Sequence, residues 1–322
     1  MARDNGTPAP VSATHGTTTS RRHALALMLG AGRWLPGALA ATDAGAPVRL
    51  AISESVVGDV NLYDARAAMQ IWIKKMTQDL NLVLDVKLFA TTQEIVEGTL
   101  RGRFDCVALN VIEYRQVTDK LDSSRIVNAA GSAGLEQYVI LVKQNSGIRQ
   151  LGDLKGRRLC TLKTPKMCVA PTWLFTVLED GHYGPAEHFF GSVATDTKFS
   201  RVVLPVFFGQ ADACLTSKRG FDTMCELNPQ VARDLKVLIS SPAMVVDFYI
   251  FRKNYQSMAR EKVISALSSL RSSAAGQQLA TLFHFDELTV RDASCLTSAL
   301  SVLERAERAT AGHKPGAERD RE

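Results

Sequence analysis

Short apolar runs of strand length alternate with amphipathic stretches of helix length from residue 48 to residue 251. This alternation predicts an α/β architecture. Residues 138–142 are so rich in branched side chains that we expect this strand to lie inside a sheet. The predicted strands span residues 48–52, 83–89, 105–109, 138–142, 159–162, 201–204, 235–239 and 248–251, with one more within residues 207–215.

Helices are predicted where apolar residues recur every three or four positions. Thr92 is placed to cap the helix that follows it, and Gly102 ends that helix. We expect residues 257–308 to be helical and the charged tail, residues 309–322, to be disordered. The other predicted helices span residues 62–80, 93–100, 112–117 and 171–178.

The N-terminal segment has the order of an export signal. Arg21 and Arg22 precede a short apolar stretch that reaches Ala31, and small residues follow at Ala38 and Ala40. This order is typical of a twin-arginine signal, so we assign residues 1–40 to the signal and exclude them from the fold. No later apolar run approaches the roughly 20 residues of a membrane helix. We therefore expect a periplasmic protein whose mature form does not span a membrane.

The composition is that of a globular protein with room for one large or two ordinary domains, since the 322 residues are 46% hydrophobic and 22% charged. The net charge of +5 is not gathered into a basic stripe, so we expect no nucleic-acid partner. No Ser-His-Asp arrangement or Gly-rich nucleotide loop is recognisable, which argues against an enzyme and against a bound cofactor. His182 and His188 have no partner carboxylate pair, and we assign no metal to them.

Six cysteines occur at positions 106, 160, 168, 214, 225 and 295, without a Cys-x-x-Cys pair. Their spacing argues against a structural zinc site. Disulfides can form in an oxidising compartment such as the periplasm. The nearest pairs in sequence are Cys160 with Cys168 and Cys214 with Cys225, but the sequence leaves the connectivity open.

Several segments between residues 47 and 305 carry a resemblance to a known family. Residues 102–110 with Tyr114, residues 138–148 and residues 151–159 are similar to signatures of the phosphonate-type (PhnD-like) solute-binding proteins, as are residues 240–242 and 251–253. The resemblance implies the type II periplasmic binding fold, in which two α/β lobes joined by a two-stranded hinge close on a ligand in the cleft between them. It implies a first lobe at residues 41–141 and 243–308, a second lobe at residues 142–242, and a monomer.

One turn of the chain departs from that family. Phosphonate binders carry Ser-Thr-Ser-Gly at a helix N-terminus, where this chain has residues 164–169, Thr-Pro-Lys-Met-Cys-Val. Pro165 lacks an amide donor, and Val169 replaces the glycine that lets the backbone approach an oxyanion. Thr164 and Lys166 could still make polar contacts with an anion, but the set of groups that would hold a phosphonate is incomplete.

Cys106 is the most specific candidate for ligand binding. It stands two residues before Ala108, which replaces an aromatic contact of the family, and the two side chains share one face of a strand. A thiol beside the cleft favours a soft ligand such as arsenite. The pattern resembles the periplasmic arsenite-binding sensor proteins of the AioX type, which implies an arsenic–sulfur bond at Cys106 and a sensor histidine kinase as partner. Cys168 is the second candidate, and the alternative for Cys106 is an ordinary core residue.

Other polar candidates fall at the carboxyl ends of predicted strands or at the hinge, where ligands of open α/β sheets gather. The alternative for Glu54 and Glu136 is a solvated loop carboxylate, and for Asn110 it is a turn residue. An uptake receptor for a phosphonate or phosphite that serves an ABC transporter is the competing function. The remaining candidates for ligand contacts are Ser53, Ser55, Tyr138, Thr164 and Lys166.

Overall fold

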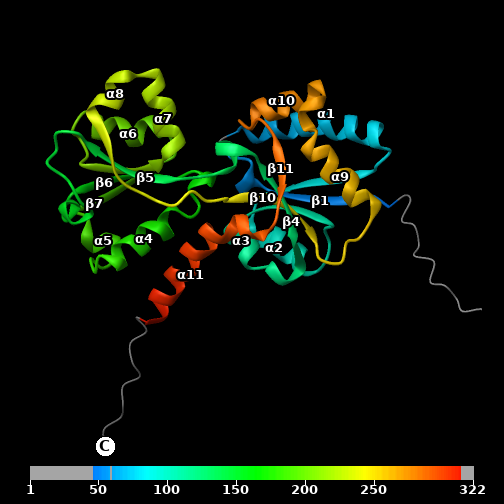
Figure 1. Cartoon of the computed structure of the whole chain (residues 1–322), viewed down its shortest axis with the longest axis horizontal. Coiled ribbons are helices and arrows are strands. Elements are labelled where there is room, and N and C mark those ends of the chain that lie inside the picture. Colours follow the sequence, from blue (N-terminus) through cyan, green and yellow to red (C-terminus); the bar gives the residue numbers. More distant parts are fainter. Residues whose placement is uncertain (1–45, 59, 313–322) are drawn as a thin grey trace, which may run out of the picture. The chain divides into compact units, whose positions relative to one another are not determined.

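The computed structural model describes residues 46–58 and 60–312 and contains two β-sheets flanked by helices (Figure 1). The expected export signal lies outside the described residues. The last helix, α11 (Thr297–Gly312), runs into the segment expected to be disordered, and residues 313–322 lie outside the described part. Among the described helices, none is long and apolar enough to cross a membrane.

The first sheet has six strands, and helices lie on both of its faces. Strand β1 is parallel to β2 and β3, whereas β10 is antiparallel to β3 and β4. In order across the sheet, the strands are β11 (Leu288–Arg291), β4 (Leu121–Ala129), β10 (Asp247–Arg252), β3 (Cys106–Asn110), β1 (Val48–Ser53) and β2 (Leu84–Phe89).

Alternation along β3 divides the core of this sheet in two. Val107 and Leu109 pack with α2 (Thr92–Leu100) and α3 (Val111–Arg115). Cys106 and Ala108 face the opposite side and pack in a separate apolar cluster. That second cluster includes residues of α1 (Leu62–Leu80), α9 (Met258–Ser268) and α10 (Ala274–Leu282).

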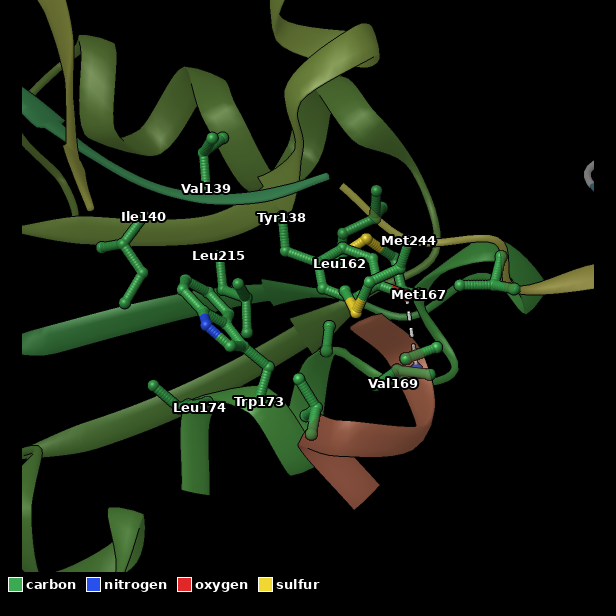
Figure 2. Packing of buried hydrophobic residues seen from close by; sticks show 14 of the residues in the cluster. Tyr138, Val139, Ile140, Leu162, Met167, Val169, Trp173, Leu174, Leu215 and Met244 are labelled. Atoms are coloured by element: carbon green, nitrogen blue, oxygen red, sulfur yellow. Dashed lines mark hydrogen bonds between the residues drawn. The ribbon is translucent and has the colours of Figure 1, made fainter. Parts of the chain in front are cut away.

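The second sheet has five strands, and β5 (Tyr138–Lys143) lies inside it between two neighbours, buried at every residue except Lys143, as its branched composition predicts. Tyr138 from β5 packs near Trp173 from α4, with Met167 and Val169 beside them (Figure 2). The strand order is β7 (Ser192–Asp196), β6 (Arg158–Leu162), β8 (Ala213–Ser217), β5 (Tyr138–Lys143) and β9 (Leu235–Ser240). The helices of this half are α4 (Ala170–Asp180), α5 (Ala186–Phe189), α6 (Phe199–Phe207), α7 (Lys218–Leu227) and α8 (Pro229–Asp234).

The chain crosses twice between the sheets, once from β4 to β5 and once from β9 to β10. The two crossing segments pair with each other, because Glu136 N donates to Met244 O and Met244 N donates to Glu136 O, both at 2.8 Å. The predicted type II fold, with two α/β lobes and a two-stranded hinge, is therefore confirmed.

Helix α11 adds a further connection between the two halves (Figure 1). Its N-terminal part follows a short turn that packs on β4, and its body packs against α4 of the second half. Arg305 on α11 forms an ion pair with Asp180 on α4, and Arg115 on α3 forms one with Glu307 on α11. The C-terminal helix therefore contacts both halves of the protein.

Several sequence predictions need correction. Residues 201–204 are not a strand but belong to α6, where Val202, Val203 and Val206 are buried at helical spacing. Thr91 rather than Thr92 caps α2, since its hydroxyl accepts from Glu94 N at 3.3 Å. Residues 138–141, which the family resemblance assigns to the first lobe, lie in β5 of the second sheet.

Three strands escaped the sequence prediction for identifiable reasons. Strand β4 is broken by polar residues, β7 is an exposed edge strand, and β11 has only four residues. Strands β4 and β7 show neither a clear apolar run nor strict alternation, and the alternation of β11 lasts only four residues.

Candidate functional site

A cavity of about 1350 Å³ is lined by residues of both halves of the protein. Its walls include Ile52 near the carboxyl end of β1, Ala108 of β3, the hinge residue Glu136 and the N-termini of α6 and α7. Ligands of open α/β sheets bind at the carboxyl ends of strands, so this cavity is the candidate binding site.

Charged groups of both signs reach the cavity. Lys166 from the turn after β6 forms an ion pair with Asp247 at the start of β10, which connects the two halves. Arg219 Nη2 donates to Ser132 O at 2.7 Å, and Lys198 precedes α6. The paired charges of Lys166 and Asp247 offset each other, whereas Lys198 and Arg219 contribute positive charge on the second-half wall.

The two helices of that wall begin differently. Ser217 caps α7 by accepting from Gly220 N at 3.2 Å. At the start of α6, by contrast, Lys198 is the N-cap residue and no side chain of the described chain caps the helix. The first amide groups of a helix have no partner within the helix, and they carry partial positive charge. The N-terminus of α6 therefore favours a negatively charged group in the cavity.

The turn over Pro165–Met167 does not form the oxyanion cradle of phosphonate binders. The buried hydroxyl of Tyr138 donates to Lys166 O at 2.9 Å. It also accepts from Val169 N at 3.4 Å (Figure 2). Met167 N is also engaged, because it donates to Thr164 O at 2.9 Å. The amide groups of Met167, Cys168 and Val169 are thus bonded within the protein. Tyr138 shapes the turn from behind and does not line the cavity.

Glu113, which sequence reasoning missed, organises the loop after β1. This carboxylate is 1% exposed and accepts hydrogen bonds from the hydroxyls of Ser53 at 2.6 Å, Ser55 at 2.8 Å and Thr92 at 3.0 Å. It also accepts from Asn110 N at 3.0 Å, while Asn110 Oδ1 caps α3. Ser53, Ser55 and Asn110 therefore support the structure of the loop, and none of the three lines the cavity.

Cys106 lies in the closed core of the first sheet. Its exposed fraction is 0%, and it packs on the face covered by α1, α9 and α10 without lining the cavity. Burial raises the pKa of its thiol, so the group stays protonated at neutral pH. The expectation that Cys106 faces the cleft is wrong: Ala108, on the same face of β3, lines the cavity, whereas Cys106 at the start of the strand is covered by apolar side chains.

Cys168 is half-buried beside the cleft but does not line the cavity. Burial, reinforced by the negative charge of Asp247, raises the pKa of its thiol to about 12. All six cysteines are free thiols, and Cys160 lies opposite Cys214 on the neighbouring strands β6 and β8. Within the described residues, no group of three His, Cys, Asp or Glu side chains could hold a metal ion.

Of the residues proposed from the sequence, three line the cavity: Glu136, Thr164 and Lys166. Glu136 is 5% exposed, so its alternative as a solvated loop carboxylate is wrong. Glu54 lies in a short turn, Glu54–Val56, outside the cavity lining. The cavity residues that sequence reasoning missed include Asn128, Lys198, Ser217, Arg219 and Asp247. Only residues 217–220 carried a usable signal, a polar stretch at the end of a strand.

A family model described as the periplasmic substrate-binding protein of a phosphonate ABC transporter matches residues 60–294. The chain belongs to this family. Members of the family are binding proteins rather than a class of enzyme, and the family description implies a periplasmic location.

Solved structures show the same fold at low sequence identity. A binding protein component of an ABC phosphonate transporter from Pseudomonas aeruginosa is 15% identical, with a TM-score of 0.56 over 85% of this chain and 91% of that chain. PhnD1 from Prochlorococcus marinus in complex with methylphosphonate is 14% identical, with a TM-score of 0.55 over 81% and 98%. XAC2383 from Xanthomonas citri bound to ATP is 12% identical, with a TM-score of 0.61 over 84% and 100%. A search of curated proteins finds no match.

Proposed function

We propose that this protein is the substrate-binding component of an ABC-type importer for an organic anion of the phosphonate class. The observation that supports it most is the cavity shared by both halves, which a family of substrate-binding proteins uses for its ligands. A ligand bound there contacts both halves at once, so it favours the closed arrangement that a transporter recognises. The proposed partner is therefore a membrane permease with its ATPase.

The anionic group of the ligand is proposed to bind on the wall formed by α6 and α7. Lys198 and the uncapped start of α6 supply positive charge there, and Arg219 lies at the start of α7. The turn at Pro165–Met167 is a weaker site for an anion. Its amides are engaged by Tyr138 and Thr164, and Lys166 is already paired with Asp247.

Arsenite sensing is the competing hypothesis, and it depended on a thiol that faces the cleft. Cys106 is sealed in the core, which removes the proposed arsenic ligand and with it the argument for a histidine kinase as partner. Cys168 is a second thiol of the described chain, and it lies near the ion pair of Lys166 and Asp247. No observation on that residue favours arsenic over an ordinary half-buried thiol.

Calorimetry with methylphosphonate, phosphite and arsenite tests the proposal. We expect methylphosphonate to bind, and Lys198→Ala and Arg219→Ala each to weaken binding about tenfold or more, because each removes a charged contact. Lys163→Ala is the matched control, since Lys163 is an exposed lysine of the same half that does not line the cavity.

The alternatives give different results. Binding that is lost in Lys166→Ala but unchanged in Lys198→Ala would place the anion at the turn instead. Binding of arsenite alone, abolished by Cys168→Ala, would overturn the proposal in favour of an arsenite receptor.

A further inference from the structure

The candidate cavity continues beyond the cleft into the first half of the protein. There it lies between the six-stranded sheet and the helices α1 and α10, in a region that we call the apolar chamber. Side chains of β1, β3, α1 and α10 form its walls. The residues that define the chamber are Ile52, Met69, Trp72, Ile73, Ala108 and Leu279.

The size of the cavity exceeds what a small oxyanion needs. Pockets for drug-sized ligands have volumes of about 300–1,000 Å³. The cleft and the chamber together measure about 1350 Å³, which lies above that range, and the residues that define the chamber are all hydrophobic. Ala108 contributes to this space, because its methyl group stands where a larger side chain would fill the chamber.

Polar groups at the cavity point to a ligand that is not purely apolar. Asn128 on β4 is 2% exposed and lines the cavity, and its Oδ1 atom has no hydrogen-bond partner among the described residues. Its Nδ2 atom donates only a long hydrogen bond of 3.4 Å to Gly134 O. A buried acceptor without a donor is unfavourable unless a ligand or water supplies the hydrogen bond. The cavity thus combines an apolar chamber with a buried acceptor, Asn128 Oδ1, that has no hydrogen-bond donor among the described residues.

We infer that the apolar chamber binds a hydrocarbon chain, so that the ligand is an amphiphilic organic anion rather than a small phosphonate. This inference rests on the proposed function, because it places the anionic group at Lys198 and Arg219 and extends the same ligand into the chamber. The hydrocarbon chain of the ligand is held by burial of apolar surface alone. The chamber therefore selects for length and bulk rather than for chemical detail.

A homologous series tests the inference. Calorimetry with n-alkylphosphonates from methyl to dodecyl, each below its micelle concentration, should show affinity that rises about fourfold for each added methylene group. The rise ends when the chain fills the chamber. A flat affinity across the series, with methylphosphonate bound, would overturn the chamber and leave the proposed function standing.

A second series with n-alkylcarboxylates of the same lengths separates the two proposals. Length-dependent binding of carboxylates without any binding of phosphonates supports the chamber and refutes the phosphonate assignment. No binding in either series refutes both.

Two variants in helix α1 test where the hydrocarbon chain of the ligand binds. Ile73→Trp fills the chamber from α1, whereas Ile71→Trp places the same bulk on the exposed side of that helix, where Ile71 is 56% exposed. We expect Ile73→Trp to abolish the length dependence, so that the longer members of the series bind this variant no more tightly than methylphosphonate does. Ile71→Trp should behave as the wild type. The inference is contradicted if an Ile73→Trp variant that circular dichroism shows to be folded retains the length dependence. Ala108→Leu, which adds bulk from β3, is an independent test with the same expected loss of length dependence.

Discussion

Replacement of Glu113 by alanine should destabilise the protein far more than an ordinary surface change. Its carboxylate accepts hydrogen bonds from Ser53 at 2.6 Å, Ser55 at 2.8 Å, Thr92 at 3.0 Å and Asn110 N at 3.0 Å. Alanine removes the single acceptor that serves all four donors. The loop after β1 and the start of α3 therefore lose their common support.

The size of the stability loss depends on which of the four donors can form a hydrogen bond with water once the carboxylate is removed. Ser53 and Asn110 are 2% and 7% exposed, so their donors are left unsatisfied in the interior. A buried donor without a partner costs about 1–3 kcal/mol, so the two together cost about 2–6 kcal/mol. Ser55 and Thr92 are less buried, and water replaces most of what they lose. We expect a loss of about 2–6 kcal/mol in the free energy of unfolding.

Urea unfolding followed by tryptophan fluorescence measures this loss, since Trp72 lies in the first half and Trp173 in the second. The control is Glu97→Ala, which removes an exposed ion pair with Arg101 and an exposed hydrogen bond from Gln93 Nε2, and should cost less than about 1 kcal/mol. The reasoning is refuted if Glu113→Ala is no less stable than Glu97→Ala. Such a result would mean that the loop rearranges and satisfies its donors elsewhere.

Three further predictions concern pH, thiol reactivity and the turn beside the cleft. Burial opposes ionisation of Asp105, but hydrogen bonds from Arg49 and Arg252 outweigh it and lower the pKa of Asp105. The stabilisation from this carboxylate is therefore present above about pH 4 and is lost as the pH falls through the lowered pKa. Between pH 7 and pH 2.5, the melting temperature of Asp105→Asn should fall less at the acid end than that of the wild type, and parallel falls would contradict this. In native protein at pH 8, Cys106 should resist a thiol reagent until urea unfolds the chain, and rapid labelling read by mass spectrometry would show that the core is open there. Tyr138→Phe should cost about 1–3 kcal/mol in urea unfolding, because it removes the hydroxyl that bridges the turn, and an unchanged midpoint would show that the bridge is dispensable.

Much of the fold follows from local pattern. The helix predicted over residues 62–80 matches α1, and the buried strand at Tyr138–Lys143 lies inside a sheet as its composition requires. Residues 201–204 show the limit of this reasoning, since a run of branched residues suits a buried helix as well as a strand. Packing decides between the two, and packing is not visible in a window of a few residues.

The site was harder to predict than the fold because its residues come from separate segments. Lys166 was found because a family turn marks it, but Asn128, Lys198 and Asp247 lie on three other elements that only the folded chain brings to one cavity. Cys106 illustrates a second limit. Alternation shows that Cys106 and Ala108 share a face, but it does not show which face the helices cover.

The position of α11 has a consequence for how the binding site exchanges its contents with solvent. A movement that separates the sheets must either carry α4 along with α11 or expose the apolar surfaces that the two helices share. Both routes cost free energy, since the first limits the amplitude of the movement and the second hydrates buried side chains. The rate of ligand dissociation therefore depends on a C-terminal helix that belongs to neither sheet.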